Sequence, residues 1–491
     1  MNQQLHNQHI LILGLGISGL SMARWCVRLG AQVTVVDTRE APPELAALQA
    51  MQADGARVSF QSQTFTADLI QGTAIRAVFK SPGLSPDAVC AVIEAAKASG
   101  LWVGSELTLF NHALRELRTS HHYTPKVLGI TGTNGKTTVT SLTGLLVARA
   151  GKSVAVAGNI GPALLDTLAQ HWDNNTLPQV WVLELSSFQL DGVTDFEPTA
   201  ATVLNLTEDH LDWHGSMAAY KAAKDNIYGF ANGKSRQTQT QIWVTHGLPE
   251  RVDEYGIEVT AGMKWLVRAV PESDEPPAKL RKGAVATPRP FVIQRLMPAD
   301  ALRIRGTHNS TNALAALALA SKAGCPLAPM LYGLREYQGE PHRMASLGIH
   351  QGVDFIDDSK GTNVGATVAA LTSLGAENAG QTIILILGGD GKGQDFTPLA
   401  APVGQYVRVA VLIGKDAPKI AAALQTTPTT VLHAATLEAA VATCAELAVA
   451  GDTVLLSPAC ASMDMFKDYK HRANVFATAV QALADDGGWA P

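Results

Sequence analysis

Twice in this chain a short apolar stretch runs directly into a glycine-rich turn that opens a helical pattern. His9 to Leu13 leads into Gly14-x-Gly16-x-x-Gly19, and Lys126 to Ile130 leads into Thr131-Gly-Thr-Asn-Gly-Lys-Thr137. A strand, a tight turn and a helix in this order form the basic unit of parallel α/β sheets, and the turn presents helix N-terminal N–H groups that can bind phosphate. We therefore expect an α/β protein with two phosphate-binding loops.

The chain of 491 residues is too long for one hydrophobic core, and at the usual domain size it predicts about three domains. A polar stretch at 115–125 is interpreted as a linker, and a second junction follows near Gly339. We expect a Rossmann-like domain at 1–119, a central P-loop ATPase-like domain at 120–339 and a second Rossmann-like domain at 340–491. Within the central domain, the polar and proline-containing segment 233–300 is interpreted as a surface insertion.

The composition argues against several classes of protein. The formal net charge is −5 and no long basic run occurs, so the sequence lacks the positive footprint that nucleic-acid binding requires. The five cysteines are widely spaced without a CxxC pair, which favours free thiols in a reducing compartment over disulfides or a zinc site. The N-terminus is polar and no run of about 18 apolar residues occurs. We expect a cytoplasmic, monomeric protein that is not inserted in a membrane.

The first glycine-rich turn fits a dinucleotide-binding fingerprint. Gly14, Gly16 and Gly19 permit a tight turn close to a diphosphate, and Asp37 ends the next apolar run, where it can accept a hydrogen bond from a ribose hydroxyl. Taken alone, this motif indicates NAD. Two alternatives remain open: a different nucleotide diphosphate such as UDP, or a close helix–strand crossing with no ligand.

The second turn is the strongest local signal. A glycine-rich loop with Lys136 and Thr137 at the start of a helix can wrap phosphates, neutralise their charge and bind magnesium, so ATP is the expected ligand. The loop departs from the common G-x-x-x-x-G-K-[ST] pattern, because Ile130 occupies the first glycine position and Gly132 is an additional glycine.

Polar residues also follow several other predicted strands. Glu184 ends the apolar run from Val180, and a carboxylate there can hold Mg²⁺. By themselves, His210 and Lys224 are more often an ordinary loop histidine and a solvated helix lysine. Two glycine-containing turns, 357–363 and 388–393, combine anionic and cationic groups after later strands, which is typical of nucleotide or substrate contacts.

Six segments together resemble the Mur ligase family, in matching order and spacing across nearly the whole chain. They are GTNGKTT at 132–138, ELSSFQ at 184–189, LNLTEDH at 204–210, His308-Asn309 with Asn312, Asp358-Ser-Lys360, and SPACAS at 457–462. The Ser81-Pro82-Gly83 turn and the extended ELSSFQL and SPACASMDMF segments are similar to the D-glutamate-adding members. The resemblance implies an ATP-dependent amide ligase that acts on UDP-N-acetylmuramoyl-L-alanine in peptidoglycan precursor synthesis.

The resemblance also implies a role for each matching residue. The UDP substrate would be bound by Gly14, Gly16, Gly19, Asp37, Arg39, Ser81, Pro82, Gly83, Asn159 and Gln189. ATP would be bound by Gly132, Thr133, Asn134, Gly135, Lys136, Thr137, Thr138, Asn312, Arg343 and Asp358. D-Glutamate would be bound by Lys360, Thr362, Lys392, Ser462 and Tyr469. Mg²⁺ would be held by Thr137, Glu184, His210 and a carbamylated Lys224, and the catalytic residues would be Lys136, Glu184, His210 and Lys224.

The implied chemistry proceeds in two steps. ATP phosphorylates the L-alanine carboxylate, and the amine of D-glutamate attacks the resulting acyl phosphate. An NAD-dependent dehydrogenase is the main alternative, but it leaves Lys136 and Glu184 without a role. A switch protein that hydrolyses ATP leaves Lys360 and Lys392 unexplained, and a folate-polyglutamate ligase lacks the domain that carries Gly14.

Overall fold

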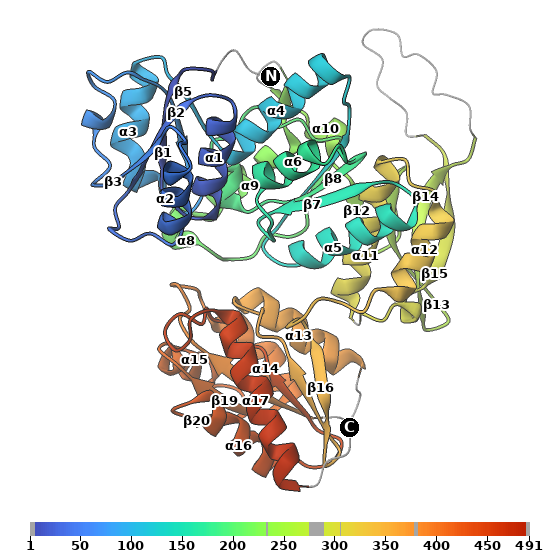
Figure 1. Cartoon of the computed structure of the whole chain (residues 1–491). Coiled ribbons are helices and arrows are strands. Elements are labelled where there is room, and N and C mark those ends of the chain that lie inside the picture. Colours follow the sequence, from blue (N-terminus) through green and yellow to red (C-terminus); the bar gives the residue numbers. More distant parts are fainter. Residues whose placement is uncertain (1–4, 232–233, 274–288, 305, 378–381, 488–491) are drawn as a thin grey trace.

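The computed structural model describes residues 5–231, 234–273, 289–304, 306–377 and 382–487. Figure 1 shows two sheet-and-helix units packed side by side and a third unit beneath them, formed by the C-terminal part of the chain. Each unit contains a parallel or mainly parallel sheet flanked by helices, so the predicted α/β class is confirmed. In the described ranges, no helix is both long and apolar enough to cross a membrane.

The N-terminal sheet has the strand order β3-β2-β1-β4-β5, and all its paired strands are parallel. Its strands are β1 (His9–Leu13), β2 (Gln32–Asp37), β3 (Val58–Ser62), β4 (Ile75–Lys80) and β5 (Trp102–Ser105). Its helices are α1 (Ile17–Arg28), α2 (Leu45–Ala53), α3 (Pro86–Ala98) and α4 (Glu106–His121). Because β1 lies between β2 and β4, the loop after β1, the end of β2 and the start of the Ser81 turn meet at one edge of the sheet.

The central sheet has the order β7-β8-β6-β9, so β6 and its phosphate loop lie between β8 and β9. Its strands are β6 (Lys126–Thr131), β7 (Val154–Gly158), β8 (Val180–Glu184) and β9 (Ala200–Val203). Helices associated with it are α5 (Lys136–Arg149), α6 (Leu164–Asp173), α7 (Ser187–Leu190), α8 (Leu211–His214), α9 (Met217–Asp225), α11 (Thr307–Lys322) and α12 (Leu327–Glu336). The carboxyl ends of β6, β8 and β9 thereby place Lys136, Glu184 and the His210 loop in one region.

The described part of the segment 233–300, which is interpreted as an insertion, contains regular structure that the sequence analysis does not predict. It forms a second, four-stranded sheet of β12 (Trp243–Val244), β13 (Glu254–Thr260), β14 (Met263–Pro271) and β15 (Phe291–Pro298). One face of this sheet buries Ile257, Leu266 and Met297 in the same core as α11. The proline-rich part at 274–288 lies outside the described residues. The sequence concealed this sheet because its exposed strand residues make the segment polar on average.

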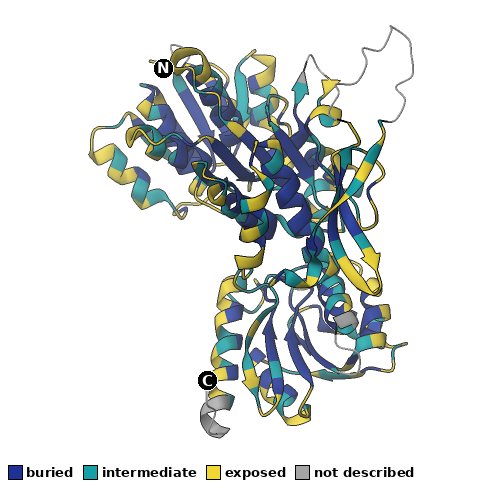
Figure 2. Cartoon of the chain, turned by 90° about the vertical axis from the view of Figure 1, so that its right-hand side faces the viewer, coloured by how far each residue is buried: buried dark blue, intermediate teal, exposed yellow. Residues whose placement is uncertain are grey.

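The C-terminal sheet has the order β16-β17-β21-β18-β19-β20, and only the β16–β17 pair is antiparallel. Its strands are β16 (Ala345–His350), β17 (Val353–Asp357), β18 (Ile383–Gly388), β19 (Val407–Ile413), β20 (Thr430–His433) and β21 (Thr453–Leu456). Its helices are α13 (Val364–Glu377), α14 (Ala400–Tyr406), α15 (Ala417–Leu424), α16 (Leu437–Leu447) and α17 (Tyr469–Gly487). Two separate apolar clusters cover its two faces. The four middle strands β17, β21, β18 and β19 are mostly buried, whereas the edge strands β16 and β20 are partly exposed, and Figure 2 shows buried strands inside this unit.

The first two units share one continuous hydrophobic core. Phe110 on α4 and Trp181 on β8 pack edge to face, with their ring centroids 5.0 Å apart. The buried Glu106 carboxylate accepts hydrogen bonds from the Ser21 hydroxyl (3.0 Å) and the Leu165 N–H (3.2 Å), so it joins α1 to the start of α6. The polar stretch interpreted as a linker at 115–125 is helical as far as His121, because α4 uses its apolar face in this core.

Candidate active site

The glycine loop after β1 is shaped by contacts within the N-terminal unit. Gly14 has a left-handed φ of +85°, and its carbonyl accepts a hydrogen bond from the Ser81 hydroxyl at 3.0 Å. A Cβ on Gly19 would lie 2.1 Å from the Gly14 oxygen, so only glycine fits there, whereas a Cβ on Gly16 would meet nothing within 4 Å. Pro82 and Gly83 continue the turn at the surface beside this loop.

Asp37, at the end of β2, stabilises the same loop through a hydrogen bond. Its carboxylate accepts hydrogen bonds from the Leu15 N–H at 2.8 Å and from the Arg39 guanidinium at 2.8 Å. Burial raises the pKa of Asp37, but the hydrogen bonds from Arg39 and Leu15 outweigh that effect and lower it to about 2. The structure therefore brings together the Gly14 loop, Asp37, Arg39 and Ser81, which the family resemblance assigns to the UDP substrate.

The second loop is held by its lysine. Gly132 and Gly135 both have positive φ values, and a Cβ on Gly135 would lie 2.7 Å from the Asn312 side chain. The Lys136 ammonium donates to the carbonyls of Gly132 (2.9 Å) and Thr133 (2.8 Å). Burial lowers the pKa of Lys136, and the neighbouring Glu184 carboxylate opposes that effect. Arg343 reaches across from the C-terminal segment and donates to the Thr137 hydroxyl at 3.1 Å.

Glu184 at the end of β8 has an unsatisfied oxygen. Its Oε1 accepts a hydrogen bond from Asn159 at 2.8 Å, whereas Oε2 is buried and has no hydrogen-bond partner in the described part of the chain. A buried carboxylate oxygen without a donor is costly, so its position favours a bound cation. Gln189, which is predicted to contact the substrate, accepts a hydrogen bond from the Ser186 N–H through Oε1 and thereby caps α7.

Lys224 is buried directly beneath the phosphate loop. Its Nζ donates to the Gly132 carbonyl at 2.9 Å and lies 4.6 Å from the centre of the Tyr220 ring. Burial, reinforced by the nearby Lys136 ammonium, lowers the pKa of Lys224 to about 6. This lysine is therefore not a solvated helix residue, and at neutral pH its amine is largely uncharged.

His210 lies beside the same region in a left-handed backbone conformation, with φ of 55°. Its ring contacts Phe188, with centroids 4.7 Å apart, and its Nε2 is 3.6 Å from the Asp209 carboxylate. Burial lowers the pKa of His210 to about 4, with Lys392 and Lys136 contributing in the same direction and Asp209 opposing. The imidazole is thus neutral at physiological pH.

The C-terminal sheet contributes a second group of polar side chains. The Lys360 ammonium lies 3.8 Å from the centre of the Tyr469 ring, and burial lowers the pKa of Lys360 to about 8. Lys392 forms an ion pair with Asp209 at 3.5 Å, which joins the C-terminal unit to the central one. Thr362 follows Lys360, and Ser462 is almost fully buried on the loop after β21.

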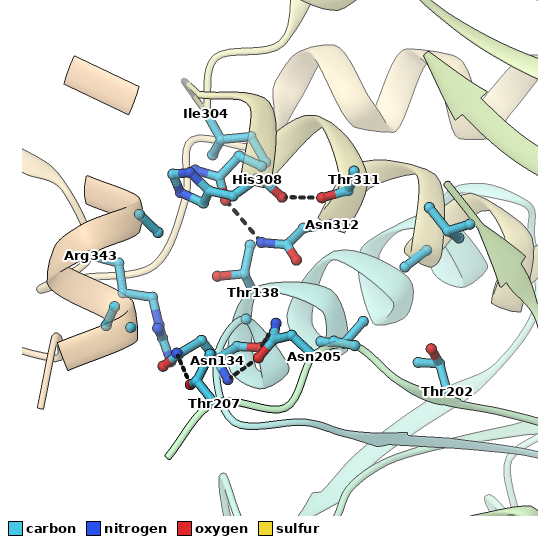
Figure 3. A pocket seen from close by; sticks show the side chains of 18 of the residues that line it. Asn134, Thr138, Thr202, Asn205, Thr207, Ile304, His308, Thr311, Asn312 and Arg343 are labelled. Carbon is cyan, nitrogen blue, oxygen red and sulfur yellow. Dashed lines mark hydrogen bonds between the residues drawn. The ribbon is translucent and has the colours of Figure 1, made fainter. Parts of the chain in front are cut away.

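A cavity of about 490 Å³ opens between the phosphate loop, α11 and the C-terminal unit. Figure 3 shows Asn134, Asn205 and Thr207 together at one end of it, with Arg343 extending toward them. Six predicted ATP-binding residues line it: Asn134, Gly135, Thr138, Asn312, Arg343 and Asp358. The Asp358 carboxylate accepts from the Ser457 hydroxyl at 2.7 Å, and burial raises the pKa of Asp358 to about 7.

Sequence reasoning missed the apolar wall of this cavity and the residue that holds its loop. Ile242 and Trp243, beside and on the short strand β12, and Ile304, just before α11, line the cavity. The Asn205 side chain accepts a hydrogen bond from the Asn134 N–H and donates one to the Asn134 carbonyl. The apolar run at 241–244 is a sequence signal for this wall, but it lies inside the segment interpreted as an insertion.

Comparison with known proteins decides the family. Three domain descriptions match this chain: "Mur ligase MurD-like, N-terminal domain" at 8–104, "Mur ligase middle domain" at 130–245, and "Mur ligase, glutamate ligase domain" at 342–460. The UDP-N-acetylmuramoylalanine--D-glutamate ligase of Albidiferax ferrireducens is 60% identical over 99% of this chain and 98% of its own. The chain belongs to the Mur ligase family. The ligase of the same name from Ralstonia nicotianae is 52% identical over 99% of both chains.

Solved structures agree with this Mur ligase in fold. The MurF ligase of Thermotoga maritima, determined in complex with ADP, superposes with a TM-score of 0.56 over 98% of this chain and 100% of its own, at 12% identity. MurF of Acinetobacter baumannii gives 0.55 at 16% identity, over 96% of this chain and 93% of its own. At these identities the likeness shows a shared three-unit architecture.

The unmodified side chains of this Mur ligase form no metal site of three carboxylates, imidazoles or thiols among the described residues. Glu184 and His210 supply two groups, and Thr137 supplies a hydroxyl. An oxygen ligand on Lys224 would therefore add what the unmodified side chains lack.

Proposed function

We propose that this Mur ligase joins D-glutamate to UDP-N-acetylmuramoyl-L-alanine with ATP and Mg²⁺, as a cytoplasmic, monomeric enzyme of peptidoglycan precursor synthesis. The observation that carries the proposal is that charged residues from two units meet around Glu184. Lys136 interacts electrostatically with Glu184, Arg343 and Lys360, which come from segments far apart in the chain. Relatives with the corresponding ligase name, 50–60% identical over nearly the whole chain, support this substrate assignment.

In this proposal, the N-terminal unit binds the UDP part of the substrate. Helix α1 begins at Ile17, directly after the Gly14 loop, so its first N–H groups face the diphosphate. Asp37 keeps this loop in place through Leu15, and its ionised carboxylate can accept from a ribose hydroxyl. Arg39 and the Ser81-Pro82-Gly83 turn complete the proposed contacts, and Asn159 and Gln189 remain candidates for the far end of the substrate.

ATP is proposed to occupy the 490 Å³ cavity, with its phosphates on the loop from Gly132 to Thr138. Ile242, Trp243 and Ile304 offer apolar surface for the base, and Asn312 offers an amide. Arg343 and Lys136 neutralise the phosphate charge, and Asp358 can accept from ribose. A positive charge on either side of the transferred phosphoryl group stabilises the charge that develops there.

The residues around Glu184 fit Mg²⁺ if Lys224 is carbamylated. The free Oε2 of Glu184 and the neutral His210 ring are available ligands, and the Thr137 hydroxyl, which accepts from Arg343, keeps a second lone pair. A lysine with a pKa of about 6 has a neutral amine at pH 7, and only a neutral amine can react with carbon dioxide to form a carbamate. When bound, magnesium would offset the repulsion between the substrate carboxylate and the triphosphate.

The bond-forming steps use these residues as follows. An oxygen of the L-alanine carboxylate attacks the γ-phosphorus, and ADP leaves with the electrons of the broken P–O bond. The D-glutamate amine then attacks the acyl carbon, phosphate leaves with the electrons of the broken acyl C–O bond, and the nitrogen loses one proton to the phosphate or to solvent. Lys360, Thr362, Lys392, Ser462 and Tyr469 are proposed to hold D-glutamate through its carboxylates. A pKa of about 4 makes His210 a weak base, which favours a ligand role over proton removal.

We also propose the division into units at residues 119 and 339. The three helix-flanked sheets, which fall within 9–105, 126–203 and 345–456, support these boundaries. The first boundary lies inside α4, and the shared core predicts that the first two units move together.

Phosphate release from ATP tests the proposed function. Purified protein receives Mg²⁺, ATP and UDP-N-acetylmuramoyl-L-alanine, together with D-glutamate, L-glutamate, D-alanine or no amino acid, and the product is identified by mass. We expect phosphate release and product only with D-glutamate. ATP hydrolysis that is indifferent to both substrates would overturn the proposal and favour an ATP-driven switch.

A further inference from the structure

Asn134 lies in the phosphate loop, but its side chain points toward the C-terminal unit. The loop backbone at this residue is fixed from the central unit, because Asn205 accepts from the Asn134 N–H at 2.8 Å and donates to its carbonyl at 3.0 Å. The side-chain amide is thus not needed to keep the loop in shape. It instead reaches Asn363, with only a long 3.5 Å contact to Thr207 in its own unit.

The amides of Asn134 and Asn363 form a reciprocal pair. Asn134 Nδ2 donates to Asn363 Oδ1 at 3.1 Å, and Asn363 Nδ2 donates to Asn134 Oδ1 at 3.0 Å. Asn363 is 2% exposed, so water does not compete for its bonds. Its Oδ1 also accepts from the Ala366 N–H at 2.9 Å, at the start of α13, and its Nδ2 lies 3.4 Å from the Asp209 carboxylate. These contacts fix the orientation of the Asn363 amide.

The pair connects two loops that the proposed function assigns to different substrates. Asn134 belongs to the loop assigned to ATP, and Asn363 directly follows Thr362 on the same loop as Lys360, and both of these residues are assigned to D-glutamate. We infer that Asn134 and Asn363 are positioning residues, which set the D-glutamate loop relative to the ATP loop. This inference rests on the proposed function. It also revises the expected role of Asn134, whose side chain acts on the amino-acid loop and not on phosphate.

A second polar link lies beside the pair. Lys392 and Asp209 join the same two units at 3.5 Å, and Asp209 also contacts Asn363. This ion pair can keep the units together after the amide pair is lost. The effect of losing the pair should therefore be a loss of alignment rather than a separation of the units, and it should appear in the kinetics of D-glutamate more than in thermal stability.

A double-mutant cycle tests the inference. Asn134→Ala removes one amide, while Asn363→Ser removes the other and retains an oxygen that can accept from the Ala366 N–H. Thr372→Ala is a matched control, because its hydroxyl bonds within α13, to the Val368 carbonyl. We expect each of the two test variants to lower kcat/KM for D-glutamate about tenfold, the magnitude of losing two modest hydrogen bonds. The KM for ATP should stay within about twofold, and the double variant should be no worse than either single variant.

A second measurement does not depend on ligation. A non-hydrolysable ATP analogue should slow hydrogen exchange of backbone amides at 360–366 in the wild-type protein and in Thr372→Ala. In Asn134→Ala and Asn363→Ser, this slowing should be lost although the analogue still binds.

Two results would overturn the inference that Asn134 and Asn363 act as a pair. Additive losses in the cycle would show that the residues act separately. A raised KM for ATP in Asn134→Ala alone, with Asn363→Ser unchanged, would return Asn134 to the phosphate. If the wild-type protein makes no product, the proposed function fails instead, and the exchange measurement still decides whether the two loops are coupled.

Discussion

Replacing Gly19 and Gly16 by alanine should separate a packing role from a ligand-binding role within one loop. A Cβ at Gly19 would lie 2.1 Å from the Gly14 carbonyl oxygen and 3.0 Å from the Ser81 hydroxyl oxygen. The first neighbour is backbone and cannot rotate away, so the start of α1 must move by about 1 Å from the loop. A methyl group forced into a packed site costs about 2 kcal/mol.

At Gly16 the same change meets no atom within 4 Å, and its φ of −102° is accessible to alanine. Gly16→Ala should therefore keep the melting temperature nearly unchanged. If the diphosphate lies on this loop, however, the added methyl group blocks its approach, and the KM for the UDP substrate should rise on the order of tenfold.

The assay combines thermal unfolding with steady-state kinetics for both variants. Gly19→Ala should lower the melting temperature by roughly 3–6 °C, as expected for a loss of about 2 kcal/mol in a large cooperative unit. A Gly19→Ala protein as stable as the wild type would refute the packing argument. A Gly16→Ala protein with an unchanged KM for the UDP substrate would refute the placement of the diphosphate.

Three further predictions concern buried charges. Burial raises the pKa of Asp358 to about 7. Between about pH 4 and 7 the unfolded chain therefore loses a proton that the folded protein keeps, and the stability of the fold falls as the pH rises. Asp358→Asn should raise the melting temperature at pH 7.5 but not at pH 4. Lys224 should give a carbamate signal in ¹³C NMR with labelled bicarbonate, and this signal should weaken below about pH 6, where the amine is protonated. The signal should be absent in Lys224→Ala. Its persistence in that variant would contradict the assignment of the carbamate to Lys224. Glu184→Gln keeps the acceptor for Asn159 but removes the free oxygen, so kcat should fall on the order of 100-fold while the melting temperature does not decrease; near-normal kcat would exclude a metal role.

Much of the fold could be predicted because its signals are local. The runs at His9–Leu13 and Lys126–Ile130 each carry a strand, a turn and a helix start within about twenty residues, and parallel sheets bring such turns to one edge. The positions of Gly14, Lys136 and Glu184 followed from that rule. The β13–β15 meander escaped detection since its strands are exposed on one face and thus have a mixed composition.

Other features depend on residues far apart in the sequence. The pairing of Asn134 with Asn363 spans 229 positions, and no local pattern distinguishes either asparagine from an ordinary loop residue. The residues around Lys224 are typical of a helix with a solvated lysine. The strand order β8-β6-β9 and the packing of α9 nevertheless bury Lys224 against the Gly132 carbonyl.

The sequence by itself determined where the two glycine-rich turns lie between a strand and a helix, because the backbone conformation of a glycine turn is a local property. Only the tertiary structure decided which side chains are charged, paired or aligned across units, because burial and electrostatic interactions depend on distances that the chain order does not contain.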